Sequence, residues 1–169
     1  WDKITIDPKL DCFIDYLNHK IFDKQDNPTG KLVIFSESKD TIQYLNKELT
    51  RRLGRTDILS VSSDDRKQLF DTIQANFDAN YQGKKQDKYN IIIATDVLAE
   101  GINLHRANVI VNYDTPWNAT RLMQRIGRVN RIGSIAGKIV NYEFYPSDEG
   151  NKQIRLYDNA FAKLQGFAS

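Results

Sequence analysis

The chain has 169 residues, of which 40% are hydrophobic, and a formal net charge of +2. A chain of this length forms one domain and buries about two thirds of its unfolded surface without metal or disulfide support. Its single cysteine, Cys12, excludes an internal disulfide framework. No apolar run is long enough to span a membrane or to form a signal-peptide core. We therefore expect a soluble, intracellular domain.

Helical and strand patterns alternate along the chain. A helix is expected first, because Leu10, Ile14, Leu17 and Ile21 form an amphipathic stripe. Further helical stripes cover residues 42–53, 69–77 and 154–164. Five short apolar runs are typical of strands, and they cover residues 31–35, 57–61, 90–95, 108–113 and 138–145. Most of these runs lack alternation, which indicates strands buried on both faces, as in a parallel sheet. The pattern predicts an α/β fold with a doubly wound parallel sheet and helices on both faces.

Two polar segments that contain Gly or Pro, residues 23–30 and 80–89, are expected to be exposed loops. The second carries Lys84, Lys85 and Lys88, which are able to contact phosphate. A simply solvated loop is the favoured interpretation of these lysines.

Ligands of such folds bind at the carboxyl ends of the strands, which here lead into residues 36–38, 62–65, 95–104 and 114–118. In the third segment, Thr95, Asp96 and Gly101 supply a hydroxyl, a carboxylate and a glycine backbone, which suit a phosphate or a ribose. The alternative is that Thr95 and Asp96 cap a helical turn and Gly101 permits a tight bend.

The stretch QRIGRVNRIGS at residues 124–134 contains no acidic residue. Positions 118–138 hold four arginines and Lys138, a local charge of +5 that leaves −3 on the remainder. A helix that begins after Asn118 places Arg121, Arg125 and Arg128 on one face until Gly127 lets the helix end. Arginines this close need an anion, and their planar fork suits phosphate oxygens. The alternative is a solvated basic helix.

TDVLAEGINL and NYDTPWNATRLMQRIGRVNRIGS resemble motifs V and VI of superfamily 2 helicases and translocases. KLVIFSES with TIQYLNKEL is similar to motif IV, and residues 66–77 resemble the segment before motif V. The match covers residues 8–145, and it favours the Swi/Snf-type ATPases, including the bacterial branch with the RNA-polymerase-associated ATPase. Asn130 and Ser134 depart from the histidine and glutamine of many such proteins.

The resemblance implies the second of two RecA-like domains, a P-loop NTPase-type fold without its own Walker A loop. Indeed, the chain contains no G-x-x-x-x-G-K-[ST] sequence. In the family, the first domain holds ATP and Mg²⁺ while arginine fingers of the second close over the γ-phosphate; by motif position these would be Arg128 and Arg131. Because the chain starts at Trp1 in a polar stretch, we expect residues 1–169 to be a fragment that is inactive alone.

Other site residues follow from the same resemblance. Gly101, Asn103 and Gln124 would lie near the nucleotide, whereas Ser36 and Thr95 would bind the nucleic-acid backbone. Arg125 would contact phosphate or an acidic group in the cleft. Asp114 and Trp117 would brace the loop before motif VI. No metal site is expected, since His19 and His105 lack ligand spacing.

The resemblance also implies the partners: an N-terminal RecA-like domain of the same chain and a nucleic acid, with duplex DNA favoured. The cytoplasm, at the bacterial nucleoid, is the expected location, with no membrane contact. Two alternatives stay open, the second domain of an RNA helicase and a helicase-like binding module without catalysis.

Overall fold

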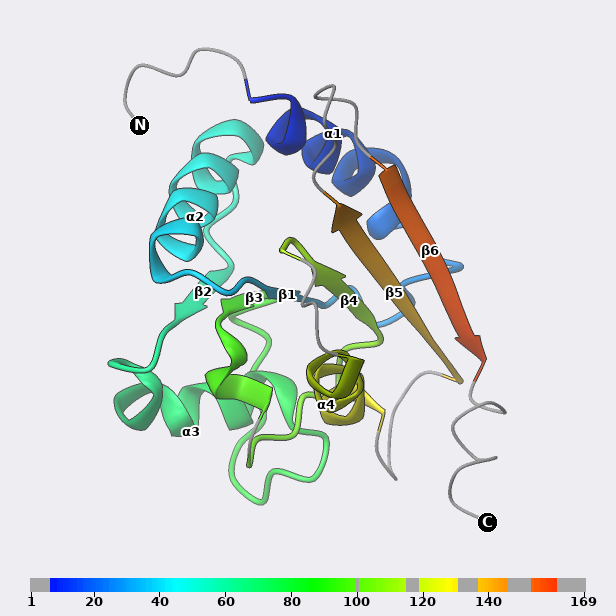
Figure 1. The fold of residues 1–169 in the computed structure, drawn as a ribbon. Coiled ribbons are helices and arrows are strands. Elements are labelled where there is room, and N and C mark those ends of the chain that lie inside the picture. Colours follow the sequence, from blue (N-terminus) through cyan, green and yellow to red (C-terminus); the bar gives the residue numbers. More distant parts are fainter. Residues whose placement is uncertain (1–6, 100, 115–118, 131–136, 146–152, 161–169) are drawn as a thin grey trace.

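A six-stranded sheet with helices on both faces forms the core of the chain (Figure 1). The computed structural model describes residues 7–99, 101–114, 119–130, 137–145 and 153–160. The strands are β1 (Leu32–Phe35), β2 (Ile58–Val61), β3 (Ile91–Ala94), β4 (Val109–Asn112), β5 (Lys138–Tyr145) and β6 (Gln153–Ala160). The helices are α1 (Pro8–Tyr16), the π-helix η1 (Leu17–Ile21), α2 (Lys39–Leu53), α3 (Arg66–Phe77), the 3₁₀ turn η2 (Asp96–Ala99) and α4 (Ala119–Val129).

The strand order is β2-β3-β1-β4-β5-β6, and the first five strands pair in parallel. This confirms the predicted α/β fold, and all five predicted strands lie within a residue or two of their expected bounds. The sheet is not wholly parallel, because β6 pairs antiparallel with β5.

The helix predicted over residues 154–164 is wrong where the structure describes it, since residues 153–160 form β6. Ile154 and Tyr157 fit the period of a helix, but Ile154 and Leu156 fit the period of a strand equally well. Whether such a short run forms a helix or a strand is decided by its surroundings. The open edge of β5 supplies a full ladder of hydrogen bonds, with Phe144 opposite Ile154.

Side chains alternate between two apolar layers because successive residues of a strand point to opposite faces. On one face, Leu32 and Ile34 of β1 pack against α1, η1 and α2. On the other face, Val33 and Phe35 pack against α3, η2 and α4. Strands buried on both faces explain why their sequences are continuous apolar runs.

The helix ends follow ordinary capping chemistry. The Asp7 carboxylate accepts the Leu10 amide at 3.0 Å and caps α1. Gly54 ends α2 in the left-handed region at φ 63°. The predicted end of α4 at Gly127 is wrong, since the helix continues to Val129. Ile126 and Val129 are both buried in the core, and their packing holds the last turn in place.

No helix in the described part of the chain is long and apolar enough to cross a membrane.

Candidate functional site

The carboxyl ends of β1, β3 and β4 meet at one edge of the sheet, where α4 also lies. Ser36 follows β1, Thr95 and Asp96 follow β3, and Asp114 lies two residues after β4. Parallel strands deliver these polar groups to the same edge without further signals in the sequence. Helix α4 then packs against η2 (Figure 1). It carries Arg125 and Arg128 of the 124–134 stretch.

Arg125 anchors α4 to this edge. Its Nε donates to Asp96 Oδ1 at 2.6 Å, and its Nη1 donates to Asn112 Oδ1 at 2.9 Å and to the Asp114 carbonyl at 3.4 Å. The guanidinium also lies over the Phe35 ring, 5.0 Å from the centroid. Although it is an arginine, the residue is 0% exposed. A buried cation persists only when it is paired and hydrogen-bonded, and these contacts supply that at Nε and Nη1, whereas Nη2 is buried without a hydrogen-bond partner among the described residues.

Asp114 connects the same edge to the start of the described chain. One carboxylate oxygen accepts Lys9 Nζ of α1 at 3.1 Å, and the other accepts the Ser36 hydroxyl at 2.5 Å. Lys9 also lies over the Tyr113 ring at 4.2 Å, and burial raises the pKa of that tyrosine. Asp114 therefore links α1, β1 and the segment that leads into α4.

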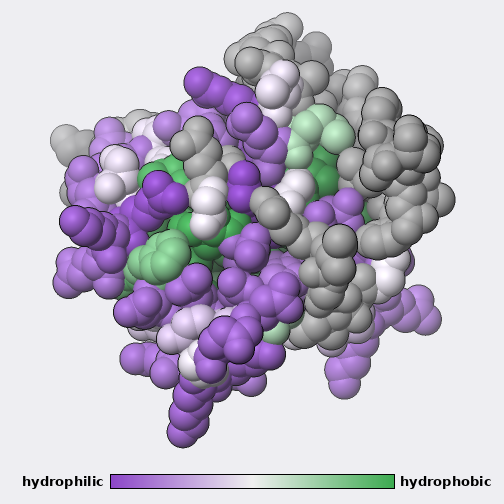
Figure 2. Space-filling view, turned by 90° about the horizontal axis from the view of Figure 1, so that it is seen from below, coloured by the Kyte–Doolittle hydropathy of each residue, from purple (hydrophilic) through white to green (hydrophobic). Residues whose placement is uncertain are grey.

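Arg121 and Gln124 occupy the outer surface of α4. The Arg121 side chain is 55% exposed, and its Nη1 lies 3.9 Å from Glu37 and 3.8 Å from Asp96. Gln124 and Met123 are exposed beside it. Most of the surface on the side of α3 and α4 is hydrophilic, with small hydrophobic areas between the polar groups (Figure 2). This outer surface of α4 is accessible to a charged ligand, unlike Arg125.

The segment after η2 returns to the C-terminal end of α4. Gly101 adopts φ 72°, and a Cβ atom there would lie 3.2 Å from Arg66 Nη2. The Leu104 amide donates to the Arg128 carbonyl at 2.9 Å. Asn103 and Arg128 are both partly exposed. The turn after β3 and the last turn of α4 are thus joined through the backbone.

The structure brings most of the predicted site residues to this edge, but in different settings. Thr95 is partly buried at the end of β3, whereas Ser36 is fully buried and its hydroxyl is taken by Asp114. Arg125 meets the acidic group Asp96, one of the two partners expected for it. Arg131, Trp117 and Ser134 lie outside the described residues. The roles of all these residues in binding nucleotide or nucleic acid stay predictions.

The sequence did not reveal that Arg125 donates hydrogen bonds to Asp96, Asn112 and Asp114. Their positions at strand ends were the available signal, although only the fold shows which arginine they hold. Among the described residues, no group of three or more His, Cys, Asp or Glu side chains is placed to hold a metal ion.

Five parallel strands with helices on both faces and an arginine-bearing helix at their carboxyl edge are the architecture of a RecA-like domain. The model of the helicase conserved C-terminal domain matches residues 8–133. The chain therefore belongs to the helicase conserved C-terminal domain family.

Its relatives carry helicase names. The chain is 54% identical to the uncharacterized ATP-dependent helicase YqhH of Bacillus subtilis (strain 168) over 46 residues, which make up 27% of this chain and 8% of the relative. Over 149 residues, 84% of this chain and 25% of the relative, it is 27% identical to the probable ATP-dependent RNA helicase DDX28 of Mus musculus. The chain spans about a quarter or less of the length of these two curated relatives.

Two solved structures share the fold. The C-terminal part of the Fun30 ATPase domain aligns with a TM-score of 0.59 and 26% identity, over 80% of this chain and 39% of that one. Dbp5 of S. cerevisiae, bound to RNA and ADP BeF3, aligns with a TM-score of 0.57 and 24% identity, over 84% of this chain and 33% of that one.

Proposed function

We propose that the chain is the second motor domain of an ATP-dependent nucleic-acid translocase of Swi/Snf type, acting on duplex DNA. In this proposal, an N-terminal RecA-like domain of the same protein holds ATP and Mg²⁺. The present domain closes over the γ-phosphate and supplies part of the nucleic-acid track. The similarity to the Fun30 ATPase domain and the Gly-Ile-Asn-Leu sequence at residues 101–104 support the Swi/Snf type and, with it, duplex DNA as the track.

The observation that carries the proposal is the anchoring of α4 by Arg125. The buried contacts with Asp96 and Asn112 fix the helix, so that Arg121 and Gln124 project from its outer surface. A fixed cationic helix stabilises charge that develops on a transferring phosphoryl group, because no reorganisation is needed at the moment of reaction. The residues at this edge fit the phosphates of a nucleotide held by another domain.

Roles for individual residues are assigned by their positions in motifs IV, V and VI. Arg128 and Arg131 act as fingers on the γ-phosphate, and Gly101, Asn103 and Gln124 approach the nucleotide. Thr95 contacts the nucleic-acid backbone without reading sequence. Ser36, which is buried and donates to Asp114, acts on the nucleic acid by positioning the end of β1. Arg125 acts on the nucleic acid through the helix that it positions, since its own guanidinium is buried.

A second candidate is the second domain of an RNA helicase. The name of the mouse relative and the RNA bound to Dbp5 in its solved structure favour it. ATP turnover of the full-length protein in the presence of duplex DNA or of RNA separates the two candidates. Stimulation by RNA alone would replace the proposed DNA track by an RNA track.

The finger assignment is tested by Arg128→Ala, Arg131→Ala and Arg131→Lys in the full-length protein. Loss of a finger is expected to lower turnover on the order of a thousandfold, with a much smaller effect on DNA affinity. Lysine is expected not to rescue, because a point charge does not reproduce the planar fork. Near-normal turnover with lost DNA affinity would move these arginines from the nucleotide to the nucleic acid. Intact turnover together with intact affinity would show that these arginines are not fingers, whereas nucleic-acid binding without any ATP turnover in the unmodified full-length protein would favour a binding module without catalysis.

A further inference from the structure

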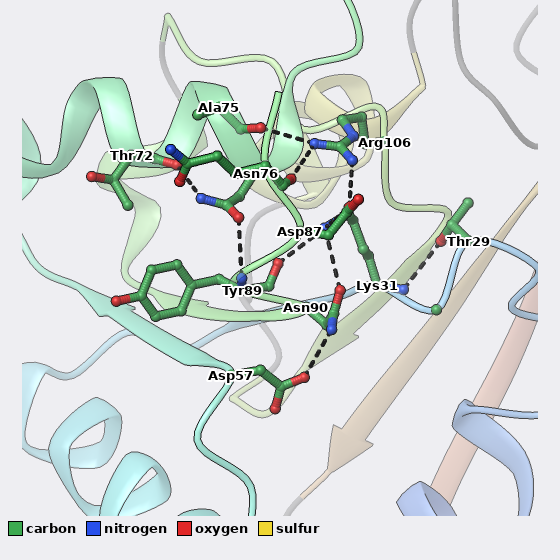
Figure 3. A network of polar contacts seen from close by, with 12 residues as sticks. Thr29, Lys31, Asp57, Thr72, Ala75, Asn76, Asp87, Tyr89, Asn90 and Arg106 are labelled. Carbon is green, nitrogen blue, oxygen red and sulfur yellow. Dashed lines mark hydrogen bonds and ion pairs between the residues drawn. The ribbon is translucent and has the colours of Figure 1, made fainter. Parts of the chain in front are cut away.

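The loop between α3 and β3 lies at the opposite end of the sheet from the candidate site. Residues 31, 57 and 90 directly precede β1, β2 and β3, and contacts of the loop gather there. Lys31 Nζ donates to the Tyr89 carbonyl at 3.0 Å, and Asn90 Nδ2 donates to Asp57 Oδ2 at 3.0 Å (Figure 3). This end of the sheet takes no part in the function proposed above.

The loop is held by its backbone at several points. The Gln86 amide donates to the Ala75 carbonyl at 2.8 Å, and Arg106 Nη1 donates to the Gln86 carbonyl at 2.8 Å. Asn76, which is fully buried, accepts the Tyr89 amide at 3.1 Å. Figure 3 shows these contacts converging from α3 and from the segment before β4. A solvated connection needs no such anchors, because its backbone groups are satisfied by water.

The acidic residue of the loop forms ion pairs with two of the anchoring residues. Asp87, the only acidic residue between positions 79 and 90, lies 2.5 Å from Arg106 Nη2 and 3.4 Å from Lys31 Nζ. Burial raises the pKa of Asp87, but Arg106 and Lys31 outweigh burial and hold that pKa below its ordinary value. The charge of this carboxylate, whose side chain is 75% exposed, is thus paired with two cations that are themselves largely buried.

Three exposed cations remain at the surface of the loop: Lys84, Lys85 and Lys88. In the part of the chain that the structure describes, no carboxylate forms an ion pair with any of these three lysines. Together with Lys31, Arg106 and Asp87 they give a local charge of +4. Exposed hydrogen-bond donors on Gln82 and Gln86 lie among them. Lysines and amides on a fixed backbone form a surface suited to a row of phosphates.

We propose that the loop of residues 80–89 is a second nucleic-acid contact, which binds the phosphodiester backbone outside the track at the carboxyl edge. This inference extends the proposed function, since it gives the motor a contact on the nucleic acid that does not depend on the nucleotide site. Sequence recognition is not expected, because lysines that contact phosphate position a protein without reading bases.

The test is the salt dependence of binding, measured by fluorescence anisotropy with the 169-residue chain. The probes are a labelled DNA duplex and an RNA duplex of the same sequence, which distinguish the two sources of phosphodiester. The variant carries Lys84→Gln, Lys85→Gln and Lys88→Gln. For DNA, its plot of log affinity against log salt is expected to become shallower by about 2–3 units, roughly one unit per lost phosphate contact. Affinity at low salt is expected to fall on the order of tenfold or more.

The matched control removes the same charge elsewhere, with Lys20→Gln, Lys47→Gln and Lys67→Gln, three exposed lysines on η1, α2 and α3. A second control replaces the three loop lysines by arginine, which keeps the charge and is expected to keep the slope. An equal loss of slope in the loop variant and the charge-matched control would show a general charge effect and overturn the proposal. The absence of nucleic-acid binding at low salt would overturn it as well.

Failure of this inference is distinguishable from failure of the proposed function. Arg121→Gln changes the carboxyl edge without touching the loop. If this variant weakens binding and the loop variant does not, the track stands and the loop is only solvated. If the loop variant leaves DNA and RNA binding unchanged but no longer binds polyglutamate, the loop contacts an acidic protein and the proposal is wrong.

Discussion

Arg125 Nε and Asp96 Oδ1 lie 2.6 Å apart and join α4 to the end of β3 across 29 positions of sequence. The cation is fully buried, whereas the aspartate side chain is 29% exposed. Replacing the aspartate is therefore expected to cost more stability than replacing the arginine, because loss of the aspartate leaves a buried charge without its counter-ion.

Asp96→Ala is expected to lower the free energy of unfolding by about 3 kcal/mol, the lower range for breaking a buried ion pair. Arg125→Met removes the charge and keeps much of the side-chain volume, so its cost is expected to be smaller. Arg121→Gln is the control, since its partners lie 3.8–3.9 Å away at a half-exposed site; about 1 kcal/mol or less is expected there. Urea denaturation measures all three. Equal costs for Asp96→Ala and Arg121→Gln would show that the buried pair does not anchor α4.

Asn76 fixes the loop through a hydrogen bond that water cannot replace. Its Nδ2 donates to the Thr72 carbonyl at 2.8 Å while its Oδ1 accepts the Tyr89 amide. Asn76→Ala is expected to cost about 2 kcal/mol, because a buried amide loses its acceptor. Hydrogen exchange at the Tyr89 amide is expected to accelerate. Asn80→Ala, at an exposed position of the same loop, serves as the control, and equal exchange in both variants would refute the role of Asn76.

Acidification is expected to loosen the amino end of the sheet. Hydrogen bonds from Arg55 lower the pKa of Asp57, against the opposing effect of burial, and the pKa of Asp87 is also below its ordinary value. Since both folded pKa values lie below the unfolded value of 3.8, the unfolded chain binds more protons in that window. The stability from these groups is present above pH 3.8 and is lost as the pH falls through the folded values.

The measurement is urea denaturation from pH 6 to about pH 2.5. Asp57→Asn is expected to flatten the acid limb of the stability curve, since its proton no longer contributes. Asp71→Asn, on an exposed position of α3, is the control and is expected to leave the limb unchanged. An unaltered acid limb in Asp57→Asn would contradict the assignment.

Two glycines with positive φ are expected to respond differently to alanine. At Gly54 nothing lies within 4 Å of an added Cβ, so Gly54→Ala is expected to cost only the left-handed backbone, about 1–2 kcal/mol. At Gly101 the added methyl also meets Arg66 Nη2 at 3.2 Å, so Gly101→Ala is expected to cost more or to displace that arginine. Denaturation compares the costs, and a smaller effect at Gly101 would show that Arg66 yields freely.

The 169-residue chain alone is expected to hydrolyse ATP no faster than buffer, because no Walker A sequence is present to hold the phosphates. Phosphate release by the purified chain, with Arg128→Ala as control, measures this. Turnover that survives repeated purification and disappears in the variant would contradict a two-domain site.

The strands were predictable because runs such as residues 32–35 and 91–94 are apolar throughout and need cover on both faces. Of the site, only those residues that lie at a strand end or within a motif were predictable. Periodicity placed three arginines on one face of α4, but it did not show that Arg125 is buried while Arg121 is exposed. How deeply each arginine is buried depends on the tertiary contacts of the helix, which cannot be read from the sequence of the helix alone.

Contacts between distant segments were beyond the sequence for the same reason. Lys9 and Asp114 are 105 positions apart, and nothing in either segment marks its partner. The three lysines of the loop were visible, whereas the neutralisation of Asp87 by Arg106 and Lys31 was not. The edge strand β6 was missed because its short run fits the helical and the strand period equally well. Pairing with β5 decides between the two.

The strand order affects how the chain folds while it is being synthesised. Among the described strands, β1 pairs with β3 and β4, and β2 pairs with β3, so the first two strands of this sheet to be made do not pair with each other. A ribosome that adds about 5–20 residues per second therefore exposes the apolar β1 for roughly 3–12 s before β3 is complete. Unpaired apolar strands associate with other chains during such intervals. Slower translation of the segment between β1 and β3 would lengthen this exposure, so the speed at which this stretch is decoded affects the yield of folded protein.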